Sequence, residues 1–325
     1  MSLAPACKQT AAKWLVRPWV LLKLGFRHVR MRWQIACAHQ HGAAYELLPE
    51  KTLNGGRSSK LVAVVTHVCR PDAQDPHKKG AASVERLQST LEGLLTSFAH
   101  CDLHLIINTY RDWEVTGQLP AEMKSRLEII RQQDTDPMSV GFEVPDIFAR
   151  HRQDTDWFVH LEDDIVIQDA TFLDKLAFFN TTVNQPKSLL LPNRYESLNG
   201  RKYYIDLRWP HEDFRAEAWS APATFKAAGI AFGQCANSHS GCYVLNRSQL
   251  ALWLDSDRGW HKQMTGAGPQ ESWSSTMLNE AFELYKPHPL NLHFLEVRHC
   301  HPTYFPRLLK YEREKQITIR CHTAE

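Results

Sequence analysis

The chain has 325 residues, of which 43% are hydrophobic and 10% aromatic, which is enough apolar material for the core of a large globular domain. Its formal net charge of +2 is too small for the concentrated basic face of a nucleic-acid-binding protein, so we expect no nucleic-acid partner. The eight cysteines contain no CxxC pair, which argues against a zinc framework or a dense disulfide scaffold and favours a reducing, cytoplasmic location.

The first predicted element is a basic amphipathic helix over residues 13–33. One face of the helical wheel is hydrophobic, with Leu15, Leu22, Phe26 and Val29, and the opposite face carries lysines and arginines. These cations interrupt the stretch, so it lacks the roughly 20 apolar residues that a membrane span needs. The pattern is typical of a helix on an anionic membrane surface, here the inner face of the cell membrane. It is equally typical of a helix packed on the following domain, and the sequence leaves both open.

Strands and helices alternate in the next part of the chain. Residues 54–59, Asn-Gly-Gly-Arg-Ser-Ser, are typical of a linker. Apolar runs and helical spacings then predict a strand at 61–68, a helix at 84–98, strands at 103–109 and 126–130, and a helix at 144–148. This alternation is the signature of an α/β protein with a mostly parallel sheet and helices on its faces.

Polar side chains follow the first two predicted strands. Thr66, His67 and Arg70 come at or after the end of the first, and Asn108 comes at the end of the second. Parallel sheets bind ligands at the carboxyl ends of their strands, so we expect these four residues to share one crevice and to bind a ligand there.

Three consecutive carboxylates follow the next apolar run. Glu162, Asp163 and Asp164 stand between the stretch 157–161 and the stretch 165–167, both of which are typical of buried strands. Uncompensated carboxylates are costly inside a protein, so they either form a solvated turn or bind a partner. Their oxygens suit a hard cation such as Mn²⁺ or Mg²⁺, which in turn neutralises a diphosphate.

Leu161-Glu162-Asp163-Asp164 resembles the DxD-type motif of GT-A-fold glycosyltransferases in its Glu-Asp-Asp form. Together with Asn-Ser-His-Ser-Gly-Cys at 237–242, it makes the chain similar to uncharacterised bacterial glycosyltransferases over residues of about 60–306. The resemblance implies that Asp164 binds the metal and that Glu162 and Asp163 approach the nucleotide. The glutamate-first motif departs from better-known families, so it does not specify the donor sugar.

The resemblance also implies an organisation and a reaction. We expect a GT-A-like, mostly parallel central sheet flanked by helices, with a sugar transferred from a nucleoside diphosphate, a UDP-sugar above all, to a glycan or glycolipid hydroxyl. Whether the reaction inverts or retains the anomeric configuration stays open. The predicted parts are an N-terminal extension and linker (1–57) and a catalytic domain (58–325), which comprises a nucleotide-binding half (58–168), an acceptor half (169–306) and a tail (307–325).

Two stretches in the second half match functional positions of GT-A enzymes. Glu271 follows a glycine-rich loop, where inverting enzymes place the acid that deprotonates the acceptor, although an acid there also suits a helix N-terminus. His299 and His301 end a strand, where a C-terminal histidine commonly joins the metal site. We expect one of these imidazoles to share the cation with Asp164.

Three helices are predicted in the same half. Asp169 is expected to cap a helix over 172–179, and Ser248 one over 250–254. A third helix is expected to follow Glu271 and to carry Met277, Leu278 and Phe282.

Two other functions fit the acidic cluster. A metal-dependent phosphoesterase also binds a cation through Asp and His, and it would hydrolyse sugar nucleotides without an acceptor. A non-catalytic carbohydrate-binding protein of the same fold would bind the donor and transfer nothing.

Overall fold

The computed structural model describes residues 58–70, 76–198, 201–205, 225–227, 229–234, 238–256, 268–274, 276–300 and 304. The predicted amphipathic helix and the C-terminal tail lie outside these ranges, so the membrane hypothesis stays a prediction. Within the described ranges, no helix combines the length and hydropathy that crossing a membrane requires.

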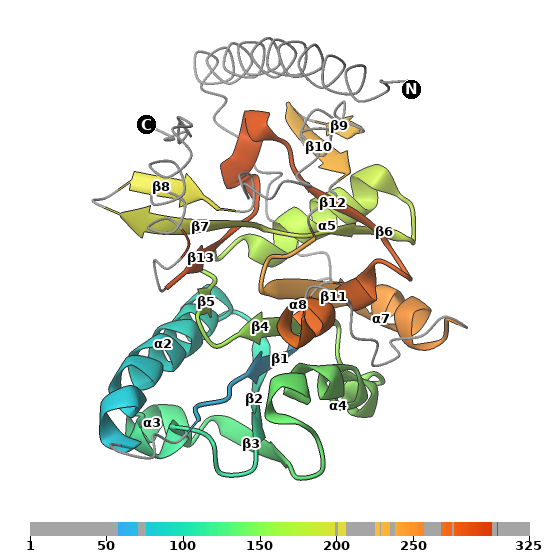
Figure 1. The fold of residues 1–325 in the computed structure, drawn as a ribbon. Coiled ribbons are helices and arrows are strands. Elements are labelled where there is room, and N and C mark those ends of the chain that lie inside the picture. The colour runs from blue at the N-terminus through green and yellow to red at the C-terminus, as the bar shows by residue number, and fades with distance from the viewer. Residues whose placement is uncertain are drawn as a thin grey trace, which may run out of the picture.

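Strands and helices are labelled as in Figure 1. The strands are β1 (Lys60–Thr66), β2 (Asp102–Tyr110), β3 (Leu127–Gln132), β4 (Trp157–Glu162), β5 (Ile165–Val166), β6 (Ser188–Leu190), β7 (Asn193–Leu198), β8 (Arg201–Tyr204), β9 (Phe225–Ala227), β10 (Ile230–Gln234), β11 (Cys242–Asn246), β12 (Glu283–Pro287) and β13 (Glu296–His299). The α-helices are α2 (Pro76–Ser97), α3 (Ala121–Lys124), α4 (Val144–His151), α5 (Phe172–Val183), α7 (Arg247–Leu254) and α8 (Pro269–Ser274). Short 3-10 helices cover 116–118, 137–143, 276–278 and 289–294.

The first sheet has the strand order β11-β4-β1-β2-β3. Strands β1 to β4 are parallel to one another, and β11 is antiparallel to β4. In Figure 1 this sheet forms the lower part of the molecule, with α2 on one side and α4 on the other. The prediction of an α/β fold with a mostly parallel sheet flanked by helices is confirmed.

Alternation along the strands gives the sheet two hydrophobic faces. On one face, Ala63 and Val65 belong to a buried cluster with Leu87, Leu91 and Leu94 of α2. The helical residues recur at intervals of three and four, which places them on one side of the helix. Burying each such leucine contributes about 1.5–3 kcal/mol, so α2 is fixed mainly by this stripe. The opposite face is covered by α4, α7 and α8.

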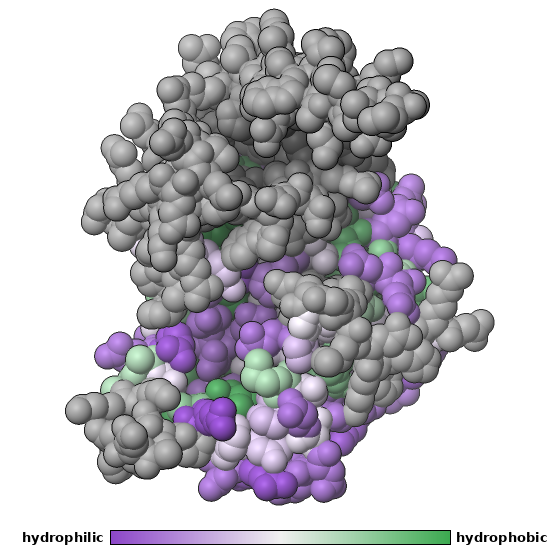
Figure 2. All heavy atoms as spheres, in the orientation of Figure 1, coloured by the Kyte–Doolittle hydropathy of each residue, from purple (hydrophilic) through white to green (hydrophobic). Residues whose placement is uncertain are grey.

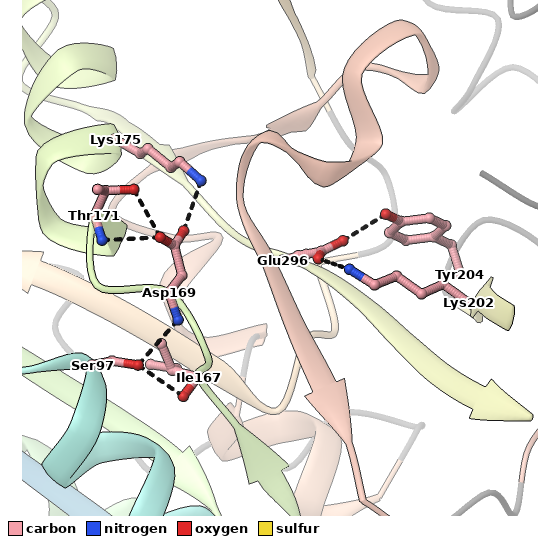
Figure 3. A network of polar contacts seen from close by, with 8 residues as sticks. All are labelled: Ser97, Ile167, Asp169, Thr171, Lys175, Lys202, Tyr204 and Glu296. Carbon is pink, nitrogen blue, oxygen red and sulfur yellow. Dashed lines mark hydrogen bonds and ion pairs between the residues drawn. The ribbon is translucent and has the colours of Figure 1, made fainter. Parts of the chain in front are cut away.

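A glycine allows α2 to approach the segment after β4. A Cβ atom on Gly93 would lie 2.7 Å from the carbonyl oxygen of Ile167, so no larger residue fits without movement. One turn later, Ser97 Oγ donates to the same carbonyl at 3.0 Å and accepts from the Asp169 amide at 3.0 Å (Figure 3). The helix is therefore packed directly against the segment that follows the acidic turn.

Two four-stranded sheets complete the described fold. Their orders are β6-β12-β10-β9 and β5-β13-β7-β8. Glu296 joins β13 to β8, because its carboxylate accepts from Tyr204 Oη at 2.6 Å and pairs with Lys202 (Figure 3). Strand β5 belongs to this last sheet, although it follows β4 after only two residues.

The ends of two helices differ from the predictions. Asn246, not Ser248, caps α7. Its side chain accepts from the Gln249 backbone amide at 2.8 Å, and the Gln249 side chain accepts from the Asn246 backbone amide at 3.1 Å. Helix α5 begins two residues later than an Asp169 cap requires; the carboxylate of Asp169 instead accepts from the amide of Thr171 at 2.9 Å.

The predicted helix over 277–282 is wrong. Helix α8 already contains Glu271 and ends at Ser274, and Met277 and Leu278 lie in a 3-10 turn. Phe282 is buried beyond that turn, just before β12. These three side chains are buried in the same hydrophobic cluster as Trp273 of α8, which explains why they are apolar although they do not form a helix.

On the face in Figure 2, the described surface is mostly hydrophilic with small hydrophobic areas. Met138 is the large hydrophobic side chain that stands out as exposed among the described residues, at 47%. Single exposed apolar residues are normal on monomers, so the described surface indicates no extended apolar docking patch.

Candidate functional site

The three acids lie where the chain passes from the first sheet to the sheet of β5. Glu162 ends β4, Asp163 and Asp164 form a turn, and Thr90 Oγ1 of α2 donates to the carbonyl of Asp163 at 3.0 Å. Strands β2 and β3 lie on one side of β1, and β4 lies on the other. The strand order therefore reverses between β1 and β4, which is where open α/β sheets bind ligands.

Strand pairing brings distant residues to this turn. Strand β13 is antiparallel to β5, and the Cys300 amide donates to the carbonyl of Asp164 at 2.8 Å. Strand β7 is parallel to β13, with Val297 opposite Arg194. His299 at the end of β13 therefore lies between the acidic turn and β7, although it is far from both in sequence.

His299 links two carboxylates. Its Nε2 lies 3.1 Å from Asp164 Oδ2, and its Nδ1 lies 3.0 Å from Glu196 Oε1, which also accepts from the Tyr304 amide at 3.0 Å. Burial lowers the pKa of His299, but the hydrogen bonds and charges of these carboxylates outweigh it and raise the pKa to about 9. Near neutral pH the ring is therefore an imidazolium that neutralises part of the buried negative charge.

A second buried cation stands beside the acids. Arg194 is 3% exposed, and its Nη1 lies 3.0 Å from Nε2 of His239. The other ring nitrogen of His239 lies 3.1 Å from Ser274 Oγ, and its carbonyl accepts from Lys286 Nζ at 2.8 Å. The guanidinium also lies 5.0 Å from the ring centroid of Tyr304, within cation–π range. A chain of polar contacts thus connects α8 to Arg194, whose charge acts on Glu162 and Asp164.

The pKa values of the Glu162 and Asp164 carboxyl groups are shifted in opposite directions. Burial, and next the charge of Asp164, raise the pKa of Glu162 to about 8. Burial also raises the pKa of Asp164, but the hydrogen bond and charge of His299 and the charge of Arg194 hold it below its ordinary value. These surroundings therefore favour the neutral form of Glu162 and the ionised form of Asp164.

Gly241 closes the site on the side of β11. Its carbonyl accepts from the Glu162 amide at 2.9 Å, and its φ of +61° lies in the left-handed region. A Cβ atom there would lie 2.8 Å from Ile165 Cγ1 and 3.1 Å from Glu162 Oε2. The glycine of the Ser-Gly-Cys segment is therefore required both for its backbone conformation and for space.

His67 and Thr66 are both buried beside the acidic turn. The Val115 amide donates to His67 Nε2 at 3.3 Å, so the ring proton lies on Nδ1 and is donated to Asp163 Oδ2 at 2.6 Å. Thr66 Oγ1 lies 3.0 Å from Nε2 of His160, a fully buried core residue. His67 therefore directly contacts the acids, while Thr66 supports the strand beneath them.

The other two residues predicted at strand ends occupy different surroundings. Asn108 lies inside β2, where its amide donates to the Val140 carbonyl at 2.9 Å and accepts from Gln132 at 2.8 Å. These bonds connect β2 to β3 and to the 3-10 helix that precedes α4. Arg70 is exposed, with its guanidinium 5.9 Å from the ring centroid of Trp113. It follows His67 closely and stands at the rim of the same edge.

Glu271 lies in α8, although the position of its side chain is outside the described part, as is the whole of His301. The helix itself is well anchored. Trp273 donates from Nε1 to the Met138 carbonyl at 3.0 Å and packs where any Cβ on Gly141 would lie. Through Ser274, the same helix reaches the polar chain to Arg194.

Sequence reasoning did not select Arg194, Glu196 and His239 as site residues. Arg194 and Glu196 stand two apart in a strand, so they share a face, and His239 is part of the Asn-x-His-x-Gly-Cys segment. That alternation of an arginine and a glutamate directly after an apolar strand was the available signal. Their importance emerges only from the pairing of β7 with β13.

The acidic turn fits a hard cation by its donor atoms. Among the described residues, buried Glu162 Oε1 and Asp164 Oδ1 have no hydrogen-bond partner. Unsatisfied buried carboxylate oxygens are costly, and oxygen is the ligand that Mn²⁺ and Mg²⁺ prefer. Asp164 and His299 are in direct contact, but the imidazolium must lose its proton before its nitrogen can coordinate a metal.

The chain matches no protein-family model and no curated protein sequence. Among solved structures, it is similar to mannose-1-phosphate geranyltransferase from Thermus thermophilus, with 10% identity over 71% of this chain and 74% of that chain. The TM-score of 0.39 is too low to establish a shared fold. The function of the site therefore has to be inferred from its own residues.

Proposed function

We propose that the protein is a metal-dependent glycosyltransferase of the GT-A type that uses a nucleoside diphosphate sugar, a UDP-sugar above all. In this reaction an acceptor hydroxyl on a glycan or glycolipid attacks the anomeric carbon. The bond from that carbon to the β-phosphate oxygen breaks, a new carbon–oxygen bond forms, and the hydroxyl proton passes to a base. Negative charge accumulates on the departing diphosphate, so the site must stabilise an anion.

One observation carries this proposal: buried carboxylates with unsatisfied oxygens lie beside buried cations at the switch point of a parallel sheet. Glu162 and Asp164 supply the oxygens, and Arg194 and His299 supply positive charge. A diphosphate with its cation has both kinds of charge and matches such a mixed site. The Glu-Asp-Asp resemblance points to the same chemistry.

We assign the parts of the donor to different residues. Asp164, with His299 or His301, is the proposed holder of Mn²⁺ or Mg²⁺, which when bound neutralises charge on the diphosphate. Arg194 is fixed by His239 and the Tyr304 ring, so its positive charge is already oriented before donor binding. Residues Thr66, His67, Arg70, Asn108, Glu162 and Asp163 remain the proposed nucleotide side of the site.

Glu271 is the proposed base if the reaction inverts. In its helix, α8, the Trp273 ring lies with its centroid 5.4 Å from that of His160 in β4, and Ser274 connects the helix to His239. Helix α8 lies on the face of the first sheet opposite to α2 (Figure 1). Anchoring of the helix limits the orientations that the carboxylate has to search.

A panel of nucleotide sugars tests the proposal. Thermal unfolding of the full chain is measured with each donor in the presence of Mn²⁺, because a ligand that binds the native state raises the melting temperature. The donor that stabilises the protein is then incubated with an acceptor panel. We expect UDP release that depends on an acceptor and on Mn²⁺.

Two results would contradict the proposal. UDP-sugar hydrolysis that proceeds equally fast without any acceptor would identify a phosphoesterase. Donor binding without turnover across the acceptor panel would identify a binding protein. Asp154→Asn is the matched control for variants of the acids, because Asp154 is exposed and lies before β4, at the opposite end of that strand from Glu162.

A further inference from the structure

Three potential metal ligands converge away from the acidic turn. They are His104 of β2, Glu128 of β3 and His151, the last residue of α4. Each offers one ligand atom, and these atoms all lie within 4.8 Å of one another. Among the residues that the structure describes, this is the one group of three or more His, Cys, Asp or Glu side chains that meets this condition.

The cluster lies toward the amino end of the first sheet. In the parallel register of β1 and β2, Val62 pairs with His104 and Thr66 pairs with Asn108. On the other side of β1, Thr66 pairs with Glu162 of β4. His104 therefore stands four residues, or about 13 Å, before the level of the acidic turn. The two groups cannot share one ion.

The fold explains why the three side chains meet. Ile106 pairs with Glu128, and His104 lies two residues before Ile106, so both polar side chains point to one face of the sheet. Helix α4 covers this face through Ile147 and Phe148, which belong to the same buried cluster as Ile106. The helix ends at His151, so its last side chain reaches the two strands.

The side chains of His104 and Glu128 contact each other and are still partly exposed to solvent. His104 Nε2 lies 2.8 Å from Glu128 Oε2, with the side chains 41% and 47% exposed. The rings of His104 and His151 stand edge to face, with centroids 5.1 Å apart. Burial lowers the pKa of His151, and the charges of His104 and Arg150 lower it further, against the opposing effect of Glu128. A neutral imidazole is the form that coordinates metals.

We propose that His104, Glu128 and His151 bind a borderline divalent transition-metal ion, Zn²⁺ in the first instance, with water in the fourth position. Two imidazoles and one carboxylate form a ligand set that zinc uses, and two nitrogen ligands disfavour Mg²⁺ and Ca²⁺. Tetrahedral bonds of about 2.0 Å place ligand atoms about 3.3 Å apart, so the present separations need only small side-chain rotations. The ion would join the end of α4 to β2 and β3 and thereby stabilise the native state.

Calorimetric titration of the metal-free full chain with ZnCl₂ near neutral pH tests this site. We expect His104→Gln and His151→Gln each to weaken one zinc-binding event by at least about tenfold. Loss of a residue that only supports a metal ligand already lowers metal affinity by roughly that factor. His100→Gln is the matched control, because His100 is exposed and outside the cluster. Asp164→Asn is a second control, which separates zinc binding at the cluster from metal binding at the acidic turn. We expect both His100→Gln and Asp164→Asn to retain zinc binding at the cluster.

Co²⁺ substitution gives a second measurement. Nitrogen and oxygen ligands in tetrahedral geometry produce visible absorption bands, and we expect them in the wild type and in His100→Gln but not in His104→Gln/His151→Gln. Far-ultraviolet circular dichroism verifies that the double variant is folded. Equal zinc affinity and equal Co²⁺ bands in wild type and folded double variant would overturn the proposal, as would the absence of zinc binding in the wild type.

Discussion

At the carboxyl end of the first sheet buried acids lie beside buried cationic side chains, whereas at the amino end the titratable groups are accessible and converge. His299 contacts both Asp164 and Glu196, so the chain itself compensates part of the buried negative charge with a cationic side chain. His104 and Glu128 are about two-fifths to one-half exposed, so water solvates them and no such compensation is needed. A metal at the first site has to displace a proton, and a metal at the second has mainly to displace water.

The largest expected effect is on turnover, and we expect it for a variant of the proposed donor site and not for the His104 and His151 cluster. Glu271→Gln should lower kcat by roughly 10²–10⁴-fold and leave donor affinity almost unchanged, because a base acts on the acceptor in the transition state. Steady-state kinetics and donor titration measure the two quantities. His104→Gln/His151→Gln is the control and should keep wild-type kcat. A kcat within about threefold of wild type would reduce Glu271 to an acid at the start of a helix.

The next effect concerns stability and depends on pH. His299→Gln should destabilise the protein by about 3–5 kcal/mol near neutral pH, because it leaves Asp164 and Glu196 buried without their cation. The folded-state pKa of His299 is raised to about 9 from an ordinary 6.5, so its charge contributes fully below the ordinary value and is lost as pH rises through about 9. The difference from wild type should therefore shrink at high pH.

Urea unfolding at a series of pH values measures this difference. His100→Gln is the control, because His100 is an exposed histidine just outside α2, and this variant should follow the wild type. A difference between His299→Gln and wild type that stays constant across the alkaline range would contradict the charged state assigned to His299.

A smaller effect is expected from the backbone beside Glu162. Gly241→Ala should destabilise the protein by about 1–3 kcal/mol, since it forces an alanine into a positive φ and brings its Cβ within 2.8 Å of Ile165 Cγ1. Gly117→Ala is matched, because its added Cβ would meet nothing within 4 Å. Urea midpoints of the two variants measure the contrast, and equal midpoints would show that the site tolerates movement at Gly241.

Most of the first sheet could be predicted because its central strands, β1 and β4, are buried on both faces. Runs such as 61–68 and 103–109 are apolar throughout most of their length, and the helix between them has apolar residues at intervals of three and four. The second half was less predictable. Helical spacing is seen at Met277, Leu278 and Phe282, but the first two lie in a 3-10 turn and the third in the segment that follows it. All three are buried, so tertiary packing explains their apolar character.

The site could be predicted only in part. The acids were recognisable because charges interrupt an apolar run, and His67 because it follows a strand. Sequence gives no register between strands, so it could not show that His299 would lie between Asp164 and Glu196. For the same reason the cluster of His104, Glu128 and His151 was not found: its members come from two strands and a helix and form no local motif.

Calorimetry of UDP binding with and without Mn²⁺ tests the central claim most directly. It is run on wild type, Asp164→Asn, His299→Gln and the double variant, with Asp154→Asn and His104→Gln/His151→Gln as controls. We predict tighter UDP binding with Mn²⁺ in wild type and both controls, loss of that gain in Asp164→Asn, and no further loss in the double variant, because residues that share one ion are not additive. UDP affinity that is the same with and without Mn²⁺ in wild type, or losses that add in the double variant, would contradict a shared site for the cation and the donor diphosphate.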